Sequence, residues 1–274
     1  MSLKRIEARF AALSGEGRAA FTPYIVAGDP DADTAWRILE RLPAAGADLI
    51  ELGMPFSDPM ADGPAIQRGA ARALAAGMDT AGVLALARRF RLGDQSTPIV
   101  LMGYYNPILN FGLVAFAAAA AEAGVDGLIV VDVPPEESGP LADALEAHDL
   151  ALIRLATPTT DAARLAIVAR RTKGFVYFVS VTGVTGGKEA DAGSIKSQVE
   201  QARTATRLPV AVGFGVKTAE GAAKIAKIAD AVVVGSALVE VVTESIALKR
   251  DPALKVLDTV AAMAHAVHSA RAGG

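Results

Sequence analysis

Eight short apolar runs recur along the chain, and the segments between them carry apolar residues at the 3.6-residue period of an amphipathic helix. The runs predicted as strands are residues 21–27, 47–52, 98–104, 127–133, 151–156, 175–180, 209–213 and 231–235. The predicted helices between them include residues 33–44, 111–123, 135–148, 161–172, 194–206 and 218–229. In a chain of 274 residues, this alternation predicts a single-domain (β/α)8 TIM barrel spanning residues 1–274.

Further helices are expected at the N-terminus, which reads MSLKRIEARFAAL, and in the long connection between the second and third strands, from about Ala65 and at 80–91. A doubly wound open sheet is the alternative fold. However, Gly28-Asp29-Pro30 follows the first strand, where that fold would have a Gly-x-Gly-x-x-Gly turn. The phrase Ala-Gly-x-Asp also recurs before two strands, at 45–48 and 123–126, as a weak helix-turn-strand repeat.

Composition excludes several classes of function. A formal net charge of −3 gives no basic surface for nucleic acid or anionic membrane, and the absence of cysteine excludes disulfides, thiolate metal sites and cysteine nucleophiles. The N-terminus does not resemble a signal peptide, and no run of 18 apolar residues occurs. We therefore expect a soluble cytoplasmic protein.

A carboxylate in the second predicted strand is the leading candidate for catalysis. Glu51 lies among apolar residues, and strand alternation points it into the barrel if Ile50 and Leu52 pack on helices. Burial would raise its pKa and suit it to proton transfer near neutral pH. The alternative is a carboxylate paired with a structural arginine or lysine. Asp62, in the loop after this strand, could act in catalysis or order a turn.

Other acid–base groups are less favourably located. Asp132 follows the fourth strand and fits either a strand-end cap or a ligand-orienting role. The histidines, His148, His265 and His268, lie away from strand ends, so a histidine base or a His-ligated metal is disfavoured. No lysine falls within a predicted strand, which disfavours a Schiff base without excluding it, because Lys188 and Lys217 lie just beyond strands.

Two glycine turns predict a phosphate site. Gly213-Phe214-Gly215 ends the seventh strand and Gly235-Ser236 ends the eighth, where barrels bind phosphate through backbone N–H groups at a helix N-terminus. Aromatic residues at or near strand ends indicate either core packing or a pocket for a flat apolar substrate. These residues are Tyr24, Tyr104, Tyr177 and Phe214.

Longer motifs identify a family. They are FTPYIVAGDP, ELGMPFSDPMADGP, LMGYYNP, DVPPEES, GVTG, GFGV and VVVGSALV, spread in order over residues 21–239. In these motifs the chain resembles the tryptophan synthase alpha chain family. The resemblance implies a retro-aldol lyase that cleaves indole-3-glycerol phosphate to indole and D-glyceraldehyde 3-phosphate. It implies Glu51 as proton donor and base, and Asp62 as the residue that holds the indole N–H.

The same resemblance implies the substrate-binding residues. The phosphate would bind at Gly186, Gly215, Gly235 and Ser236, and the indole would lie among Tyr24, Met102, Tyr104, Tyr177 and Phe214, with Thr185 of the loop after strand six packing against Asp62. Two positions depart from some members of the family: Tyr24 replaces phenylalanine, and Val181 replaces arginine.

The resemblance further implies a partner. The expected assembly is an alpha2beta2 heterotetramer with a tryptophan synthase beta chain, which binds pyridoxal phosphate, whereas this chain itself is expected to need no cofactor or metal. Asp58, in an apolar loop, is the expected inter-subunit contact. Two other functions stay open: another phosphate-binding barrel isomerase or lyase, and a weakly catalytic subunit that mainly activates its partner.

Overall fold

The structure is a computed structural model that describes residues 2–179, 192–213 and 215–271. Eight parallel strands close into a barrel in chain order, with β8 pairing back onto β1. The strands are β1 (Ala20–Val26), β2 (Ile50–Gly53), β3 (Ile99–Gly103), β4 (Gly127–Val130), β5 (Ala151–Ala156), β6 (Val176–Val179), β7 (Val210–Gly213) and β8 (Ala231–Val234). The predicted (β/α)8 barrel is therefore confirmed.

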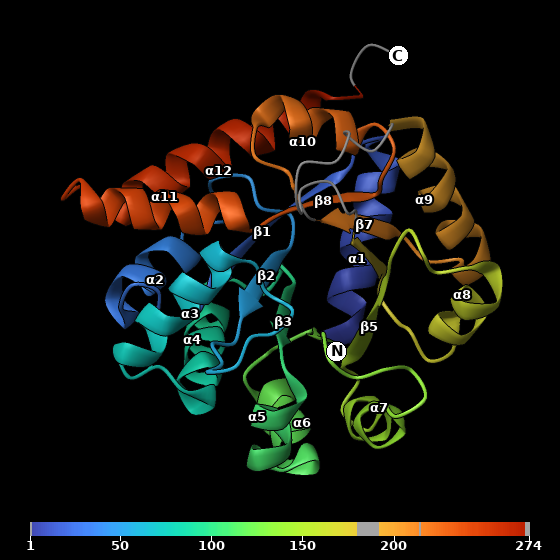
Figure 1. Cartoon of the computed structure of the whole chain (residues 1–274), viewed down its shortest axis with the longest axis horizontal. Coiled ribbons are helices and arrows are strands. Elements are labelled where there is room, and N and C mark those ends of the chain that lie inside the picture. The colour runs from blue at the N-terminus through green and yellow to red at the C-terminus, as the bar shows by residue number, and fades with distance from the viewer. Residues whose placement is uncertain (1, 180–191, 214, 272–274) are drawn as a thin grey trace.

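Figure 1 shows the helices arranged around the strands. They are α1 (Ser2–Gly15), α2 (Ala32–Leu39), α3 (Pro64–Ala75), α4 (Thr80–Gly93), α5 (Tyr105–Phe111), α6 (Leu113–Glu122), α7 (Gly139–Glu146), α8 (Ala162–Ala169), α9 (Ala192–Thr206), α10 (Ala219–Ala226), α11 (Ser236–Ala247) and α12 (Pro252–Ser269). The N-terminal helix and the extra helix between β2 and β3 are both present, as predicted.

Side-chain alternation divides the apolar residues between two cores. Leu49 lies in the cluster that fills the barrel, which α1 closes at the amino ends of the strands with Ile6 and Phe10. Ile50 and Leu52 lie instead in the cluster between strands and helices. Since successive strand residues face opposite sides, Glu51 points into the barrel, as the sequence predicts.

Several predicted boundaries were wrong for local reasons. The predicted helix over 111–123 corresponds to α6, which begins only at Leu113 because Gly112 has a φ of 93°, and α5, which ends at Phe111, was not predicted. Strand β4 ends at Val130 rather than at 133, and α7 begins at Gly139 rather than at 135. Residues 131 and 132 form a turn that ends the strand, and Pro134 and Pro135 lie in the connection before α7.

Buried carboxylates hold the amino end of the barrel together, and they explain the Ala-Gly-x-Asp repeat. Asp126 is fully buried and accepts hydrogen bonds from Arg5 and Arg91, each at 2.7 Å, and from the Ile99 N–H at 2.8 Å. Burial nevertheless keeps the pKa of Asp126 above its ordinary value. In each copy of the repeat, the aspartate joins the start of one strand to a neighbouring strand and to arginine side chains from outside the barrel.

Asp48 is the equivalent group before β2. It accepts two hydrogen bonds from Arg18, at 2.9 and 3.0 Å, and one from the Phe21 N–H at 2.9 Å, and it lies 2.8 Å from His268. Burial alone would raise the pKa of Asp48, but His268 and Arg18 hold it below its ordinary value. His268 therefore packs α12 against the barrel.

No single helix in the described part of the chain is both long and apolar enough to cross a membrane. The pair α3 and α4 together meets the length and composition required, but the two helices bend by 94° at their junction.

Removing the Asp126 carboxylate should destabilise the fold strongly. Asp126→Ala leaves the buried Arg91 guanidinium without its partner, and we expect unfolding free energy measured in urea to fall by about 3–5 kcal/mol. The matched control is Glu240→Ala, which breaks the half-exposed Arg68–Glu240 pair and should cost less than about 1 kcal/mol. Equal losses in the two variants would contradict this account of the amino end.

Candidate active site

Glu51 is the most buried carboxyl group at the mouth of the barrel. Its relative exposure is 2%, and its Oε1 has no hydrogen-bond partner among the described residues. Burial, and secondarily the charge of Asp62, raises the pKa of Glu51 to about 8. The alternative of a structural ion pair is therefore wrong for Glu51 among the described residues, and at neutral pH the group is a protonated acid.

Asp62 reaches the same site from the loop after β2. Its Oδ2 accepts a hydrogen bond from the Tyr104 hydroxyl at 3.0 Å, and that hydroxyl in turn accepts one from the Ala61 N–H at 3.0 Å. The Phe56 ring packs 5.2 Å from the Tyr104 ring, centroid to centroid. Burial raises the pKa of Asp62, and the bond from Tyr104 partly offsets this. The side chain of Asp62 thus contacts the barrel rather than only its own turn.

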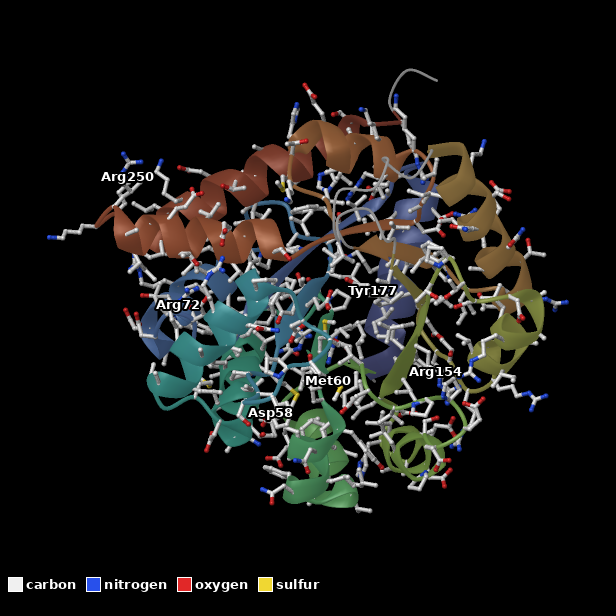
Figure 2. The ribbon with its side chains drawn as sticks, in the orientation of Figure 1. Asp58, Met60, Arg72, Arg154, Tyr177 and Arg250 are labelled. Carbon is white, nitrogen blue, oxygen red and sulfur yellow. The ribbon has the colours of Figure 1, made fainter. Side chains whose placement is uncertain are left out.

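Two buried tyrosines, Tyr24 and Tyr177, lie near enough to Glu51 for its charge to affect their pKa values. Tyr24 is the direct neighbour of Glu51 in the β1–β2 register. Burial, reinforced by the charges of Asp62 and Glu51, raises the pKa of Tyr24 well above its ordinary value, and burial with Glu51 does the same for Tyr177. Both phenols therefore stay neutral donors. Figure 2 shows Tyr177 within the ring of helices.

Each of these tyrosines lies against a glycine. A Cβ added to Gly53 would lie 2.2 Å from the Tyr24 hydroxyl, and one added to Gly213 would lie 2.1 Å from the Tyr177 hydroxyl. Any side chain at Gly53 or Gly213 would overlap the tyrosine hydroxyl, so both positions need glycine while the tyrosines stay in place. The sequence analysis missed both contacts, although a glycine closing an apolar strand was the available signal.

The remaining described candidates lie at the same rim. Met102 is half-buried and packs against both apolar clusters near the end of β3. Gly235 lies against the Tyr24 ring, where an added Cβ would be 3.2 Å away, and Ser236 opens α11. Gly215 has a φ of 78°, which favours glycine at that turn. A helix that begins at the barrel mouth offers N–H donors and a positive dipole end to an anion.

Several candidates lie outside the described residues. These are Val181, Thr185, Gly186, Lys188 and Phe214, so their expected roles stay predictions. Asp58 is exposed on the loop after β2, where it accepts a hydrogen bond from the Ser57 hydroxyl at 2.5 Å. Met60 of the same loop is 84% exposed, and Figure 2 labels both residues there.

Two other acidic residues near the ends of the strands have structural roles. Asp132 accepts a hydrogen bond from the Tyr105 N–H at 2.9 Å and so caps α5, which is the strand-end cap that the sequence allowed. Asp29, which was not singled out, is buried and pairs with Arg72 at 2.7 and 2.8 Å. That pair ties α3, and with it the end of the Asp62 loop, to the end of β1. Within the described ranges, no group of three or more His, Asp or Glu could hold a metal ion.

The fold and this rim together are those of a barrel enzyme, in which two carboxyl groups with raised pKa values lie at the same end of the barrel as a helix N-terminus that favours an anion. The family model of the tryptophan synthase alpha chain matches residues 10–268. The tryptophan synthase alpha chain of Phenylobacterium zucineum is 63% identical over 271 residues, covering 99% of this chain and 98% of the relative. That of Caulobacter vibrioides is 60% identical over 273 residues, covering 100% and 99%.

Solved structures agree with these relatives. The crystal structure of the tryptophan synthase alpha subunit from Legionella pneumophila matches with a TM-score of 0.90 at 40% identity, covering 96% of this chain and 98% of that one. The chain therefore belongs to the tryptophan synthase alpha chain family, as its motifs indicated, and it is an enzyme of that family's lyase class.

Replacing Glu51 should stabilise the protein, and more so at high pH. The folded pKa of about 8 lies above the ordinary value of 4.5, so Glu51 lowers the stability of the folded protein as pH rises through this window. Glu51→Gln removes that cost, which reaches up to about 5 kcal/mol above pH 8. Urea unfolding at pH 5 and pH 9 should reveal a gain at pH 9 and little gain at pH 5. The exposed Glu137→Gln is the control, and an equal gain for Glu51→Gln at both pH values would contradict the raised pKa.

Proposed function

We propose that this chain cleaves indole-3-glycerol phosphate to indole and D-glyceraldehyde 3-phosphate, with Glu51 and Asp62 as its catalytic pair. The observation that carries the proposal is the buried, protonated carboxyl of Glu51, with a pKa of about 8, near enough to the loop aspartate Asp62 for its charge to raise that pKa. Membership of the tryptophan synthase alpha chain family supports it.

The proposed steps balance without a cofactor. Glu51 gives its proton to C3 of the indole ring, which makes the ring an electron sink. The resulting carboxylate takes the proton of the glycerol hydroxyl on the carbon attached to C3. The C–C bond then breaks, its electron pair returns to the ring, and the hydroxyl carbon becomes the aldehyde. One proton is added and one removed, so Glu51 ends the cycle protonated.

Asp62 supplies the opposite charge in this scheme. Its carboxylate accepts the indole N–H and stabilises the positive charge that develops on the ring nitrogen when C3 is protonated. The hydrogen bond from Tyr104 supports this role, because it lowers the pKa of Asp62 and orients the group. In this proposal the two carboxyl groups act in different protonation states, with Glu51 neutral and Asp62 ionised.

The substrate would bind at the same rim of the barrel, with its indole ring and its phosphate at different residues. We propose that the indole ring packs among Tyr24, Met102, Tyr104, Tyr177 and Phe214, with Thr185 closing on Asp62. Backbone N–H groups at Gly186, Gly215, Gly235 and Ser236 would hold the phosphate. The N-terminal end of α11 supports this, because its dipole favours an anion.

We further propose that a tryptophan synthase beta chain, carrying pyridoxal phosphate, binds the loop after β2 in an alpha2beta2 assembly in the cytoplasm. The exposed Asp58 and Met60 support an interface here. Phe56 of the same loop packs on Tyr104, which bonds Asp62. This chain itself would need no cofactor. Two other functions, a different phosphate-binding lyase or isomerase and a mere activator of the partner, are separated by assaying indole release with and without a beta chain.

The substitution Glu51→Gln should abolish indole release. The amide cannot donate a proton to C3 and then accept one, so we expect kcat to fall by about 10²–10⁴ or more. The measurement is the initial rate of indole release, with circular dichroism to check the fold. The Glu137→Gln variant should keep its activity, and near-normal turnover by Glu51→Gln would overturn the assigned role.

The pH dependence of kcat/KM should report the ionisation of Glu51. Because the reaction needs the protonated acid, we expect kcat/KM for indole release to fall about tenfold per pH unit above about pH 8. Initial rates from pH 6 to pH 10 test this. An increase in kcat/KM through pH 8 would mean instead that the ionised group starts the reaction.

A further inference from the structure

A cavity of about 320 Å³ opens at the amino end of the barrel, remote from the carboxyl ends of the strands where the proposed active site lies. Four arginines, Arg18, Arg203, Arg207 and Arg271, line it with a single carboxylate, Asp230. They come from three separate parts of the chain. Arg18 follows α1, Arg203 and Arg207 lie in and just after α9, and Arg271 follows α12. This concentration of cationic charge has no part in the proposed lyase reaction.

Two of these arginines are already neutralised. Arg18 pairs with Asp48, at 2.9 and 3.0 Å, and with the exposed Glu16. Arg203 pairs with Asp230 at 3.1 Å, and the same carboxylate oxygen also accepts the Val210 N–H. These pairs join the connections around the cavity and explain why Arg18 and Arg203 lie there.

The other two guanidinium groups have no carboxylate partner among the described residues. Arg271 donates its Nε and one Nη to the carbonyls of Ala226 and Ala229, at 2.8 and 2.6 Å, which leaves its charge uncompensated. Arg207 is exposed, and its side chain makes no ion pair with a described residue. Its backbone φ of 58° is a conformation usually taken by glycine after a helix, yet here it carries an arginine that lines the cavity.

Apart from Ser14, the rest of the lining is apolar. Phe10 and Leu13 of α1 and Leu208 and Pro209 before β7 all line the cavity. Two uncompensated guanidinium groups match a dianion, and their planar forks fit phosphoryl oxygens. The apolar wall would shelter an attached ring or short hydrocarbon from water.

We propose that this arginine cavity, defined by Arg18, Arg203, Arg207 and Arg271, binds a small phosphate monoester that carries an apolar group. The phosphoryl dianion lies between Arg207 and Arg271, and the organic group lies against Phe10 and Leu13. The proposal does not depend on the lyase function, because no residue of the cavity belongs to the catalytic rim.

The test uses the whole chain with 15N-labelled arginine side chains, so that the Nε–H signals of Arg203 and Arg271 report on this cavity alone. Each signal is assigned by its loss in Arg203→Lys or Arg271→Lys. Phenyl phosphate should shift both signals saturably, and inorganic phosphate should bind about threefold or more weakly because it leaves the apolar wall exposed. Added salt should weaken both.

The decisive variant is Arg207→Gln, because the Arg207 side chain makes no ion pair or hydrogen bond with another described residue. Losing one charge-assisted pair should weaken phenyl phosphate binding by about tenfold or more, while indole release stays unchanged. Arg250→Gln is the matched control: Arg250 is likewise exposed, lies at the turn between α11 and α12 (Figure 2), and should leave binding unchanged. The proposal would be overturned if phenyl phosphate caused no saturable shift, or if Arg207→Gln bound phenyl phosphate as tightly as the unaltered chain does. Equal affinity of the chain for phenyl phosphate and inorganic phosphate would also overturn it.

Discussion

The chemistry of this barrel depends on one unfavourable burial. An ionised carboxylate with an orphaned oxygen inside an apolar barrel costs several kcal/mol, so Glu51 keeps its proton at neutral pH. The surrounding groups reinforce that state. The nearby charge of Asp62 raises the pKa of Glu51 further, and no arginine or lysine among the described residues pairs with Glu51. The fold thus keeps Glu51 protonated, which is the state that the proposed proton donor needs.

The buried carboxyl groups at the two ends of the barrel differ in their hydrogen bonding. At the amino end, Asp48 and Asp126 are saturated with arginine and backbone donors, and α1 fills the opening with apolar side chains. At the carboxyl end, Glu51 Oε1 has no hydrogen-bond partner among the described residues, and Asp62 Oδ2 accepts a bond from Tyr104. Tyr104 is the link there, because its hydroxyl holds Asp62 and its ring packs on the loop that carries Asp58. A partner that presses on that loop therefore acts two contacts away from a proposed catalytic carboxylate.

The sequence predicted what depends on local periodicity. Alternation along one strand was enough to turn Glu51 inward, and the regular exchange of strands and helices was enough to predict the barrel. It did not predict the partner of Asp62, because Tyr104 lies 42 residues further along and meets it only in the closed barrel. The contacts of Tyr24 with Gly53, and the gathering of Arg18, Arg207 and Arg271, are hidden from a linear pattern for the same reason. The expected roles of Thr185 and Gly186 came from the family resemblance alone.

The most direct test of the central claim is the ionisation of Glu51 itself. Glutamate labelled with 13C at the side-chain carboxyl gives a signal that is assigned by its loss in Glu51→Gln, and its chemical shift can be followed from pH 4 to pH 10 in the unliganded protein. We expect the Glu51 carboxyl signal to show a single titration with a pKa of about 8. A carboxylate already ionised at pH 5 would contradict it, because Glu51 would then have no proton to give at neutral pH.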